Sequence, residues 1–387
     1  MDVLAPNDRG FHLTEVKSSS SQKEEHLPDA AVQVHVLEQS GIRITGVDVM
    51  HLNKECHFPD LSNLFERTDV TAAVQPLLGK VGWEIDALLQ MLDGPLPDIA
   101  IGLQCHEPYE CPFMERCWPK NPDHIMRLYS IGPKKGCDFL LTGVNRISDL
   151  PATQKLNATQ KRQIRAMKEG HIIVEPGLAK ALEAFDGRLG FLDFETIQRA
   201  VPVWPGMVPW EQAPAQFSYH ESNGDGTHTH AEYLAEGPKD CRQELARRMV
   251  EATQHADKVA TYSHFEKTRI RGLQEAVPEL RAELETLEGK LVDLLPVVRE
   301  NVYHPEFLGS FSLKYVLHPL VPELTYDDLV IVDGLVASVE IARLLFVAGK
   351  IPRDEHDRVR QDLLNYCERD TWAMVKVLEK LRELSGH

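Results

Sequence analysis

Two acids within an apolar run are the residues whose types and spacing best suit metal chemistry. Residues 190–196 read GFLDFET, with Asp193 and Glu195 two positions apart. Side chains alternate between the faces of a strand, so both carboxylates share one face with Phe191. Burying an ionised carboxylate is costly, and a like charge beside it raises one pKa. A bound divalent cation would remove both penalties, which makes this strand a candidate metal site.

A late helix offers a third acid. Residues 363–381 read LLNYCERDTWAMVKVLEKL, and their periodicity predicts a helix whose apolar stripe includes Cys367 and Met374. Asp370 falls within this stripe, and Tyr366 lies one turn earlier on the same face. An acid in a buried stripe needs a partner, so we expect Asp370 to meet other polar groups inside the fold.

Three more strands are expected around GFLDFET. They are APAQFSYHES and THTHAEYLAE, joined by a strong Asn-Gly-Asp-Gly turn, and DKVATYS, which leads into a helix that begins near HFEKTRIRGL. His228 and His230 look like metal ligands. Alternating histidines on a hairpin are more often surface residues, so we leave both out of the predicted site.

The order of these motifs resembles the DEDD exonucleases of the RNase H-like superfamily. The resemblance implies that Asp193, Glu195 and Asp370 are ligands of two Mg²⁺ or Mn²⁺ ions and that Tyr366 orients the attacking water. Its second motif here reads His-Phe-Glu, so Glu266 takes the place of an aspartate with a longer arm. The segment GSFSLKYVLHPL resembles the family's Ser-Leu-Lys stretch, which implies that Lys314 approaches phosphate.

A second constellation occupies the N-terminal region, which reads as a hairpin, a helix and a strand. Asp2 precedes a dense turn signal, and Glu15 and Lys17 share one face of the strand FHLTEVKSS. A helix expected over residues 29–41 carries Gln33. An acid and a lysine on one strand, with another acid on its partner, suit a metal site with a water-orienting lysine.

This order resembles the PD-(D/E)xK nucleases, most closely the RecB-like branch with iron–sulfur clusters. The resemblance implies that Asp2 and Glu15 bind metal, that Lys17 positions water and that Gln33 supports the site. The helix that this family places ahead of the first acid is not seen before Asp2, so we expect weak or absent activity here. An exposed hairpin followed by an ordinary helix is the alternative interpretation.

Three equally spaced cysteines indicate a soft-metal site. Cys105, Cys111 and Cys117 lie in the Pro-punctuated stretch IGLQCHEPYECPFMERCWP. The RecB-like iron–sulfur nucleases place three cysteines after the nuclease core and one before it, so the resemblance implies a [4Fe–4S] cluster. Cys56 is the candidate for the fourth ligand, with Cys137 as a substitute. A zinc site or free thiols remain open.

Composition and charge describe an ordinary globular protein. The 387 residues suffice for two domains, and we find neither a bilayer-spanning run nor a signal peptide, so the cytoplasm is the expected location. The net charge of −17 counts against a nucleic-acid partner. Basic residues nevertheless gather locally, and we predict that Lys161, Arg162 and Arg165 contact nucleic acid. A solvated helix face is the alternative.

The expected fold class is α/β. Residues 1–130 are predicted to form a partial RecB-like PD-(D/E)xK domain with the cysteine cluster, residues 131–186 a helical linker, and residues 187–387 an RNase H-like mixed sheet flanked by helices. The combination resembles a bacterial family known only as a domain of unknown function. Its most recognisable stretches are FLDFET, PYECPF, SLKYVL and YCERD.

These patterns predict a metal-dependent 3′–5′ exonuclease that acts on single-stranded DNA or RNA. Two ions about 4 Å apart would activate water and stabilise the leaving oxygen. An all-acid site suits Mg²⁺, and the bound metals also explain how an acidic protein binds a polyanion. A binding or scaffold protein that keeps the fold without chemistry is the first alternative. A structure-specific endonuclease is the second.

Overall fold

The computed structural model describes residues 2–386, which form two compact units. Unit 1 holds the chain up to Cys111 together with the insert Arg199–Glu211, and unit 2 holds the remainder. Both units combine helices and strands, so the predicted α/β class is confirmed. The finer limits at residues 130 and 186 stay a prediction. Within residues 2–386, no helix has the length and apolar character that crossing a bilayer requires.

Unit 1 is built on a four-stranded sheet in the order β1-β2-β3-β4, in which only the β2–β3 pair is parallel. Its elements are β1 (Val3–Asn7), β2 (Gly10–Val16), α1 (His26–Gln39), β3 (Ile44–Leu52), β4 (Phe65–Asp69) and α2 (Thr71–Asp93). Leu13 and Val49 pack with Ala30 and Val34 of α1 in an apolar core. The predicted hairpin, helix and strand are therefore confirmed.

The insert Arg199–Glu211 belongs to unit 1, although in the sequence it lies between two strands of unit 2. The amide of Gly206 donates to the carbonyl of Phe58 at 2.9 Å, and the amide of Phe58 donates to the carbonyl of Met207 at 3.0 Å. Trp204 and Met207 are fully buried. The sequence pattern did not predict that these residues pack with the N-terminal unit rather than with the residues adjacent to them in sequence.

Unit 2 contains a five-stranded sheet in the order β10-β9-β6-β7-β8. Its strands are β6 (Leu189–Gln198), β7 (Gln212–Ser222), β8 (His228–Leu234), β9 (Lys258–Thr261) and β10 (Leu291–Asp293). β7 runs against both of its neighbours, whereas β9 is parallel to β6 and to β10. Four strands therefore run in one direction and β7 in the other. The four predicted strands are all present, and β10 is an additional one.

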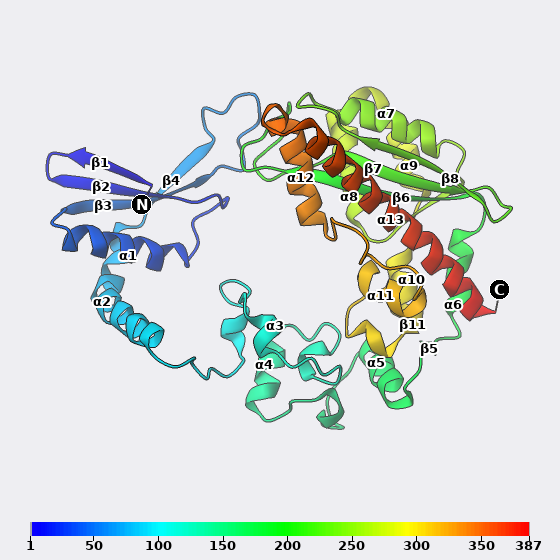
Figure 1. Cartoon of the computed structure of the whole chain (residues 1–387), viewed down its shortest axis with the longest axis horizontal. Coiled ribbons are helices and arrows are strands. Elements are labelled where there is room, and N and C mark those ends of the chain that lie inside the picture. Colours follow the sequence, from blue (N-terminus) through cyan, green and yellow to red (C-terminus); the bar gives the residue numbers. More distant parts are fainter. Residues whose placement is uncertain (1, 387) are drawn as a thin grey trace. The chain divides into compact units, whose positions relative to one another are not determined.

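Helices cover both faces of this sheet. They are α7 (Arg242–Thr253), α8 (Phe265–Ala276), α9 (Arg281–Lys290), α10 (Leu294–Asn301), α11 (Leu313–Leu320), α12 (Gly334–Val347) and α13 (Arg353–Ser385). Leu192 and Phe194 pack in one core with α7, α8 and α9. Phe191 packs in another with Ala373 and Met374 of α13, the red helix that crosses the sheet in Figure 1. The alternation predicted for GFLDFET is confirmed.

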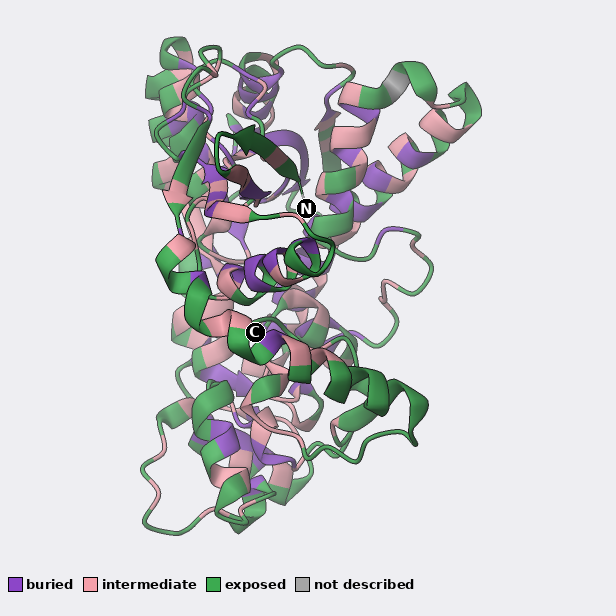
Figure 2. Ribbon diagram, turned by 90° about the vertical axis from the view of Figure 1, so that its left-hand side faces the viewer, coloured by how far each residue is buried: buried purple, intermediate pink, exposed green. Residues whose placement is uncertain are grey.

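Shorter elements connect the sheet of unit 2 to the preceding chain. They are α3 (Met114–Cys117), α4 (Pro133–Leu141), α5 (Ala158–Glu169), β5 (Ile173–Val174), α6 (Leu178–Leu182) and β11 (Val302–Tyr303), which pairs with β5. α5 begins with a capping box between Asn157 and Gln160. Figure 2 shows buried residues gathered inside the packed elements and exposed residues on the outer faces of the helices.

Candidate functional site

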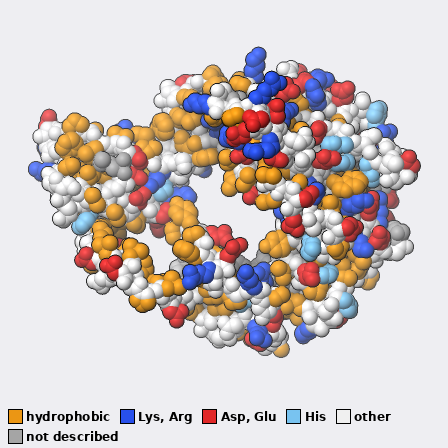
Figure 3. Space-filling model, in the orientation of Figure 1, with side chains coloured by type: hydrophobic (Ala, Val, Ile, Leu, Met, Phe, Trp, Pro, Cys, Tyr) orange, Lys and Arg blue, Asp and Glu red, His pale blue; other side chains and the backbone are white. Residues whose placement is uncertain are grey.

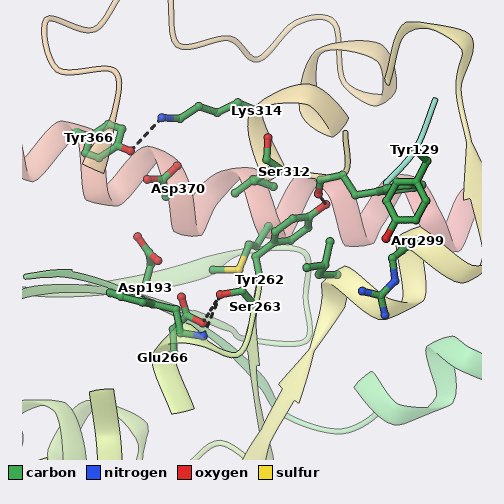
Figure 4. A pocket seen from close by; sticks show the side chains of 15 residues that line it. Tyr129, Asp193, Tyr262, Ser263, Glu266, Arg299, Ser312, Lys314, Tyr366 and Asp370 are labelled. Carbon is green, nitrogen blue, oxygen red and sulfur yellow. Dashed lines mark hydrogen bonds between the residues drawn. The ribbon is translucent and has the colours of Figure 1, made fainter. Parts of the chain in front are cut away.

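Three carboxylates from two elements meet at the sheet of unit 2. Asp193 and Glu195 of β6 and Asp370 of α13 each offer an oxygen, and these three atoms lie within 4.8 Å of one another. Figure 4 shows Asp193 rising from the sheet toward Asp370 on the helix above it. Glu195 is buried, and the other two are half-buried. The structure therefore brings together three of the four acids that the sequence predicted for this site.

The local folding of β6 and α13 explains this arrangement. Leu189 and Phe191 pack into one core and Leu192 and Phe194 into the other, so the part of β6 that carries the acids is held between two apolar layers. Pairing with β7 shifts register after Glu195, a bulge of the kind that re-aims side chains beside active sites. Tyr366 and Asp370 lie one turn apart on α13.

The ionised form of these acids is disfavoured when no cation is bound. Burial, followed by the charge of Asp370, raises the pKa of Asp193 and of Glu195 well above their ordinary values. Burial also raises the pKa of Asp370 to about 6, against the opposing effects of a hydrogen bond from Tyr326 and the charge of Lys314. Such perturbed carboxylates in a hollow are typical of functional sites.

Glu266 stands at the margin of this group. It lies in the first turn of α8, is 4% exposed and accepts a hydrogen bond from the Ser263 hydroxyl at 3.4 Å. Its charge raises the pKa of Asp193, and burial raises its own pKa to about 7. It does not belong to the 4.8 Å group of the described acids. Its role as fourth ligand stays a prediction.

Three hydroxyl and amine groups surround the acids. The Lys314 amine donates to the Tyr366 hydroxyl at 3.1 Å and also to the carbonyl of Val332, and Figure 4 shows the first of these bonds above Asp370. The Tyr326 hydroxyl donates to Oδ1 of Asp370 at 2.5 Å. Burial raises the pKa of Tyr326 and of Tyr366, so both phenols stay protonated. Sequence reasoning missed Tyr326.

The segment that carries Tyr326 is fastened to α13 beside the acids. The Arg369 guanidinium donates to both carboxylate oxygens of Asp328, at 2.9 and 2.8 Å, and to the carbonyl of Thr325. Together with the Tyr326–Asp370 bond, these contacts tie residues 325–328 to a single turn of the helix.

Hollows flank the acids on two sides. One of about 690 Å³ is lined by aromatic rings and by Arg299 and Lys314. Another of about 370 Å³ is lined by the acids and by residues that begin α12, such as Gly334. Asp193 and Asp370 line both. The carboxylates therefore stand where a substrate chain could extend to either side.

The N-terminal residues predicted to form a second site are also neighbours. Glu15 accepts hydrogen bonds from Lys17 at 2.8 Å and from Gln33 at 2.6 Å. Lys17 also pairs with Asp29, which sequence reasoning missed, and this bond lowers the pKa of Asp29. Asp2 instead accepts a hydrogen bond from the backbone of β2. A lysine thus neutralises the clustered acids of unit 1, and the nuclease role stays a prediction.

The predicted cysteine ligands are divided between the units. Cys105 and Cys111 lie in unit 1, where the Cys111 amide donates to the Cys105 carbonyl at 2.9 Å, and Cys117 ends α3 in unit 2. Cys56 is fully buried against apolar neighbours, and its thiol donates to the carbonyl of Asp60 at 3.4 Å. No disulfide joins the cysteines of the described residues. The iron–sulfur or zinc site stays a prediction.

The basic residues predicted to bind nucleic acid are partly occupied by other contacts. Arg162 is 7% exposed, and it donates to Glu175 at 3.0 Å and to the carbonyl of Arg299 at 2.8 Å. Arg165 pairs with the same Glu175 at 2.9 Å, whereas Lys161 is exposed. On the face drawn in Figure 3, Lys and Arg side chains lie interspersed with acids. Arg162 is therefore a structural group in this arrangement.

Comparison with known families gives one match. Residues 190–312 match a domain of unknown function (DUF2779). The matched segment contains Asp193, Glu195 and Glu266 and ends before Tyr366 and Asp370. No curated protein and no solved structure matches the chain. The predicted resemblance to such a family is confirmed for this segment alone.

Proposed function

We propose that unit 2 is an RNase H-like nuclease domain that hydrolyses phosphodiester bonds with divalent metal ions. The observation that carries this proposal is that Asp193, Glu195 and Asp370 meet within 4.8 Å, on two elements, and together line the smaller hollow. Mutual repulsion and burial make this meeting unfavourable unless positive charge is added. A protein that only needed a stable fold gains nothing from such a cluster.

The donor set fits Mg²⁺ or Mn²⁺. Hard divalent cations take carboxylate oxygens and keep several waters, and an opening to solvent leaves room for both waters and phosphate oxygens. Asp193, Glu195 and Asp370 would hold one ion between them, and Glu266 would reach a second ion beside Asp193. When bound, the ions supply an activated water and stabilise charge on the leaving oxygen.

The other residues of the site act on water and phosphate. The Tyr366 phenol stays protonated, receives a hydrogen bond from Lys314 and donates its own hydrogen toward Asp370, where it can orient a water that enters between them. The Lys314 amine lies close enough to this phenol to pair with a phosphate oxygen at the same place. Arg299, on the wall of the larger hollow, supplies a second positive charge for the phosphate chain.

The hollows favour a single-stranded polynucleotide as the substrate. The larger hollow is lined by the rings of Tyr129, Tyr262, Phe265 and Phe311. Aromatic rings next to cationic groups are the elements with which proteins hold unpaired nucleotides, by stacking on bases and pairing with phosphates. Openings on both sides of the acids suit a chain whose terminal nucleotide passes the metals.

The test is a nuclease assay with single-stranded DNA and RNA, each labelled at either end, in Mg²⁺ or Mn²⁺. We expect release of mononucleotides from the 3′ end. Asp193→Asn should reduce this activity to background, whereas Asp354→Asn, an exposed acid on the same helix as Asp370, should retain it. Tyr366→Phe should lower kcat by about 10²-fold while substrate affinity is kept.

Three outcomes would redirect the proposal. Internal fragments in place of mononucleotides would indicate a structure-specific endonuclease. Intact oligonucleotides under every condition would favour a binding or scaffold protein that retains the fold without chemistry. Activity that survives Asp193→Asn and disappears in Lys17→Ala would assign the chemistry to unit 1.

A further inference from the structure

A second group of metal-ligand side chains lies between the sheet edge and α13. His220 of β7 and His230 of β8 face each other across the strand pair, with ring centroids 4.5 Å apart. Glu368 of α13 completes the group, in which one potential ligand atom from each residue lies within 4.8 Å of the others. No Lys or Arg in the described part of the chain forms an ion pair with Glu368.

Two hydroxyls fix which ring nitrogens carry hydrogen. Ser218 Oγ contacts Nε2 of His230 at 2.9 Å and Thr371 Oγ1 at 2.8 Å. Thr371 Oγ1 contacts Nδ1 of His220 at 2.8 Å and the carbonyl of Glu368 at 3.0 Å. When all four contacts are hydrogen bonds they need four hydrogens, of which the two hydroxyls supply two and the two rings supply one each. Both hydroxyls are buried.

The remaining ring nitrogens therefore carry lone pairs, and that of His230 faces the Glu368 carboxylate. Nε2 of His220 and Nδ1 of His230 carry no hydrogen in this network, and Nδ1 of His230 lies 3.9 Å from Glu368 Oε1, beyond hydrogen-bond range. Two lone pairs and a carboxylate repel one another unless a proton or a metal cation lies between them.

We propose that His220, His230 and Glu368 bind one Zn²⁺ ion, with solvent in the remaining position. Zinc takes neutral imidazole nitrogens and carboxylate oxygens at about 2.0–2.2 Å, which places ligand atoms about 3.3 Å apart in a tetrahedron. The Glu368 side chain is 48% exposed and can close the present gap by rotating. Ligating histidines that donate their other ring N–H to a fixed partner are the usual arrangement at such sites.

The position of this site gives the ion a structural role. β8 is the edge strand of the sheet, and β7 contacts α13 through Ser218, His220 and the Gln216 amide, which donates to the carbonyl of Leu363 at 2.8 Å. A zinc ion would add a bond between α13 and the edge strand. It would hold Glu368 toward β8 while Asp370, two residues on, faces the acids of β6.

The test is Co²⁺ binding to the full chain, with millimolar Mg²⁺ present to fill the acid site. We expect one Co²⁺ per chain with visible d–d absorption and no thiolate charge-transfer band, displaced by Zn²⁺. His230→Ala and Glu368→Gln should each weaken binding at least about tenfold. His255→Ala, which removes an exposed histidine elsewhere, and Asp193→Asn should bind like the wild type.

Zinc should also slow hydrogen exchange along α13 in the wild type and leave Glu368→Gln unchanged. Because Glu368 is largely exposed, this variant is expected to fold, and circular dichroism checks it. Equal binding by the wild type and His230→Ala overturns the proposal, as does a cobalt spectrum dominated by thiolate bands. A nuclease assay that fails leaves this measurement unaffected, because the zinc ligands are separate from the acid group.

Discussion

Glu266 imposes a cost on the folded protein that one substitution removes. Its pKa is raised from 4.5 to about 7, chiefly by burial, and the residue is 4% exposed. Each pKa unit corresponds to about 1.4 kcal/mol, so the ionised form lowers the free energy of unfolding by about 3 kcal/mol. Glu266→Gln keeps the size of the side chain and removes this charge. The metal-free variant should therefore be more stable at pH 8 by up to that amount.

The pH dependence has a definite sign. Because the pKa is raised on folding, the folded protein holds the proton more tightly than the unfolded chain. The loss of folding stability caused by ionised Glu266 is absent below pH 4.5, grows between pH 4.5 and about 7, and is complete above that range. At pH 5 the difference in the free energy of unfolding between the wild type and Glu266→Gln should shrink to about 1 kcal/mol or less. A cation bound at the acid site should narrow it at pH 8 as well.

Hydrogen exchange of the α8 and α13 amides is the appropriate assay, because it reports the opening of unit 2 separately from unit 1. The measurement is made in a metal chelator at pH 5 and pH 8, and the intrinsic exchange rates are corrected for pH. Glu285→Gln, which changes an exposed acid on α9, is the matched control and should alter nothing. A Glu266→Gln stability gain that is the same at both pH values would refute the reasoning, as would no gain at pH 8.

Two further predictions concern packing and charge. Gly190→Ala should destabilise unit 2 by about 1–3 kcal/mol in a urea titration, because a Cβ there would lie 2.2 Å from the Tyr219 hydroxyl. The control Gly272→Ala has open space around the added Cβ and should be neutral or slightly stabilising in the same titration. Lys17→Met should destabilise unit 1 by about 1–3 kcal/mol, because Glu15 loses its ion pair. Adding Glu15→Gln should recover part of this loss of stability. No recovery in the double variant would show that the ion pair is unimportant.

The acids of unit 2 could be predicted because their positions follow simple periodicities. Strand alternation places Asp193 and Glu195 on the face opposite Leu192, and helical spacing places Tyr366 with Asp370. Both patterns depend only on local backbone geometry, which tertiary packing did not alter. The division of the chain was harder to predict, because the insert between β6 and β7 packs by contacts remote in sequence.

Tyr326, His220 and Asp29 were missed for different reasons. Tyr326 lies in a segment without helix or strand periodicity, so nothing local indicates its direction. His220 alternates with Gln216 and Ser218 on one face of β7, and such polar residues need partners when they are buried. Asp29 precedes Gln33 by four residues on α1, so the two share a face.

The tie between residues 325–328 and α13 has a consequence for the timing of ligand entry. Tyr326 donates to Oδ1 of Asp370, so an ion at the proposed metal site would meet a carboxylate with one oxygen already engaged. Loop motions of this kind occur on nanosecond to microsecond timescales when a segment is free, and local unfolding is slower. The Arg369–Asp328 contacts place this segment in the slower class. For the proposed metal ions, we expect exchange at Asp370 to be limited by release of this segment rather than by diffusion.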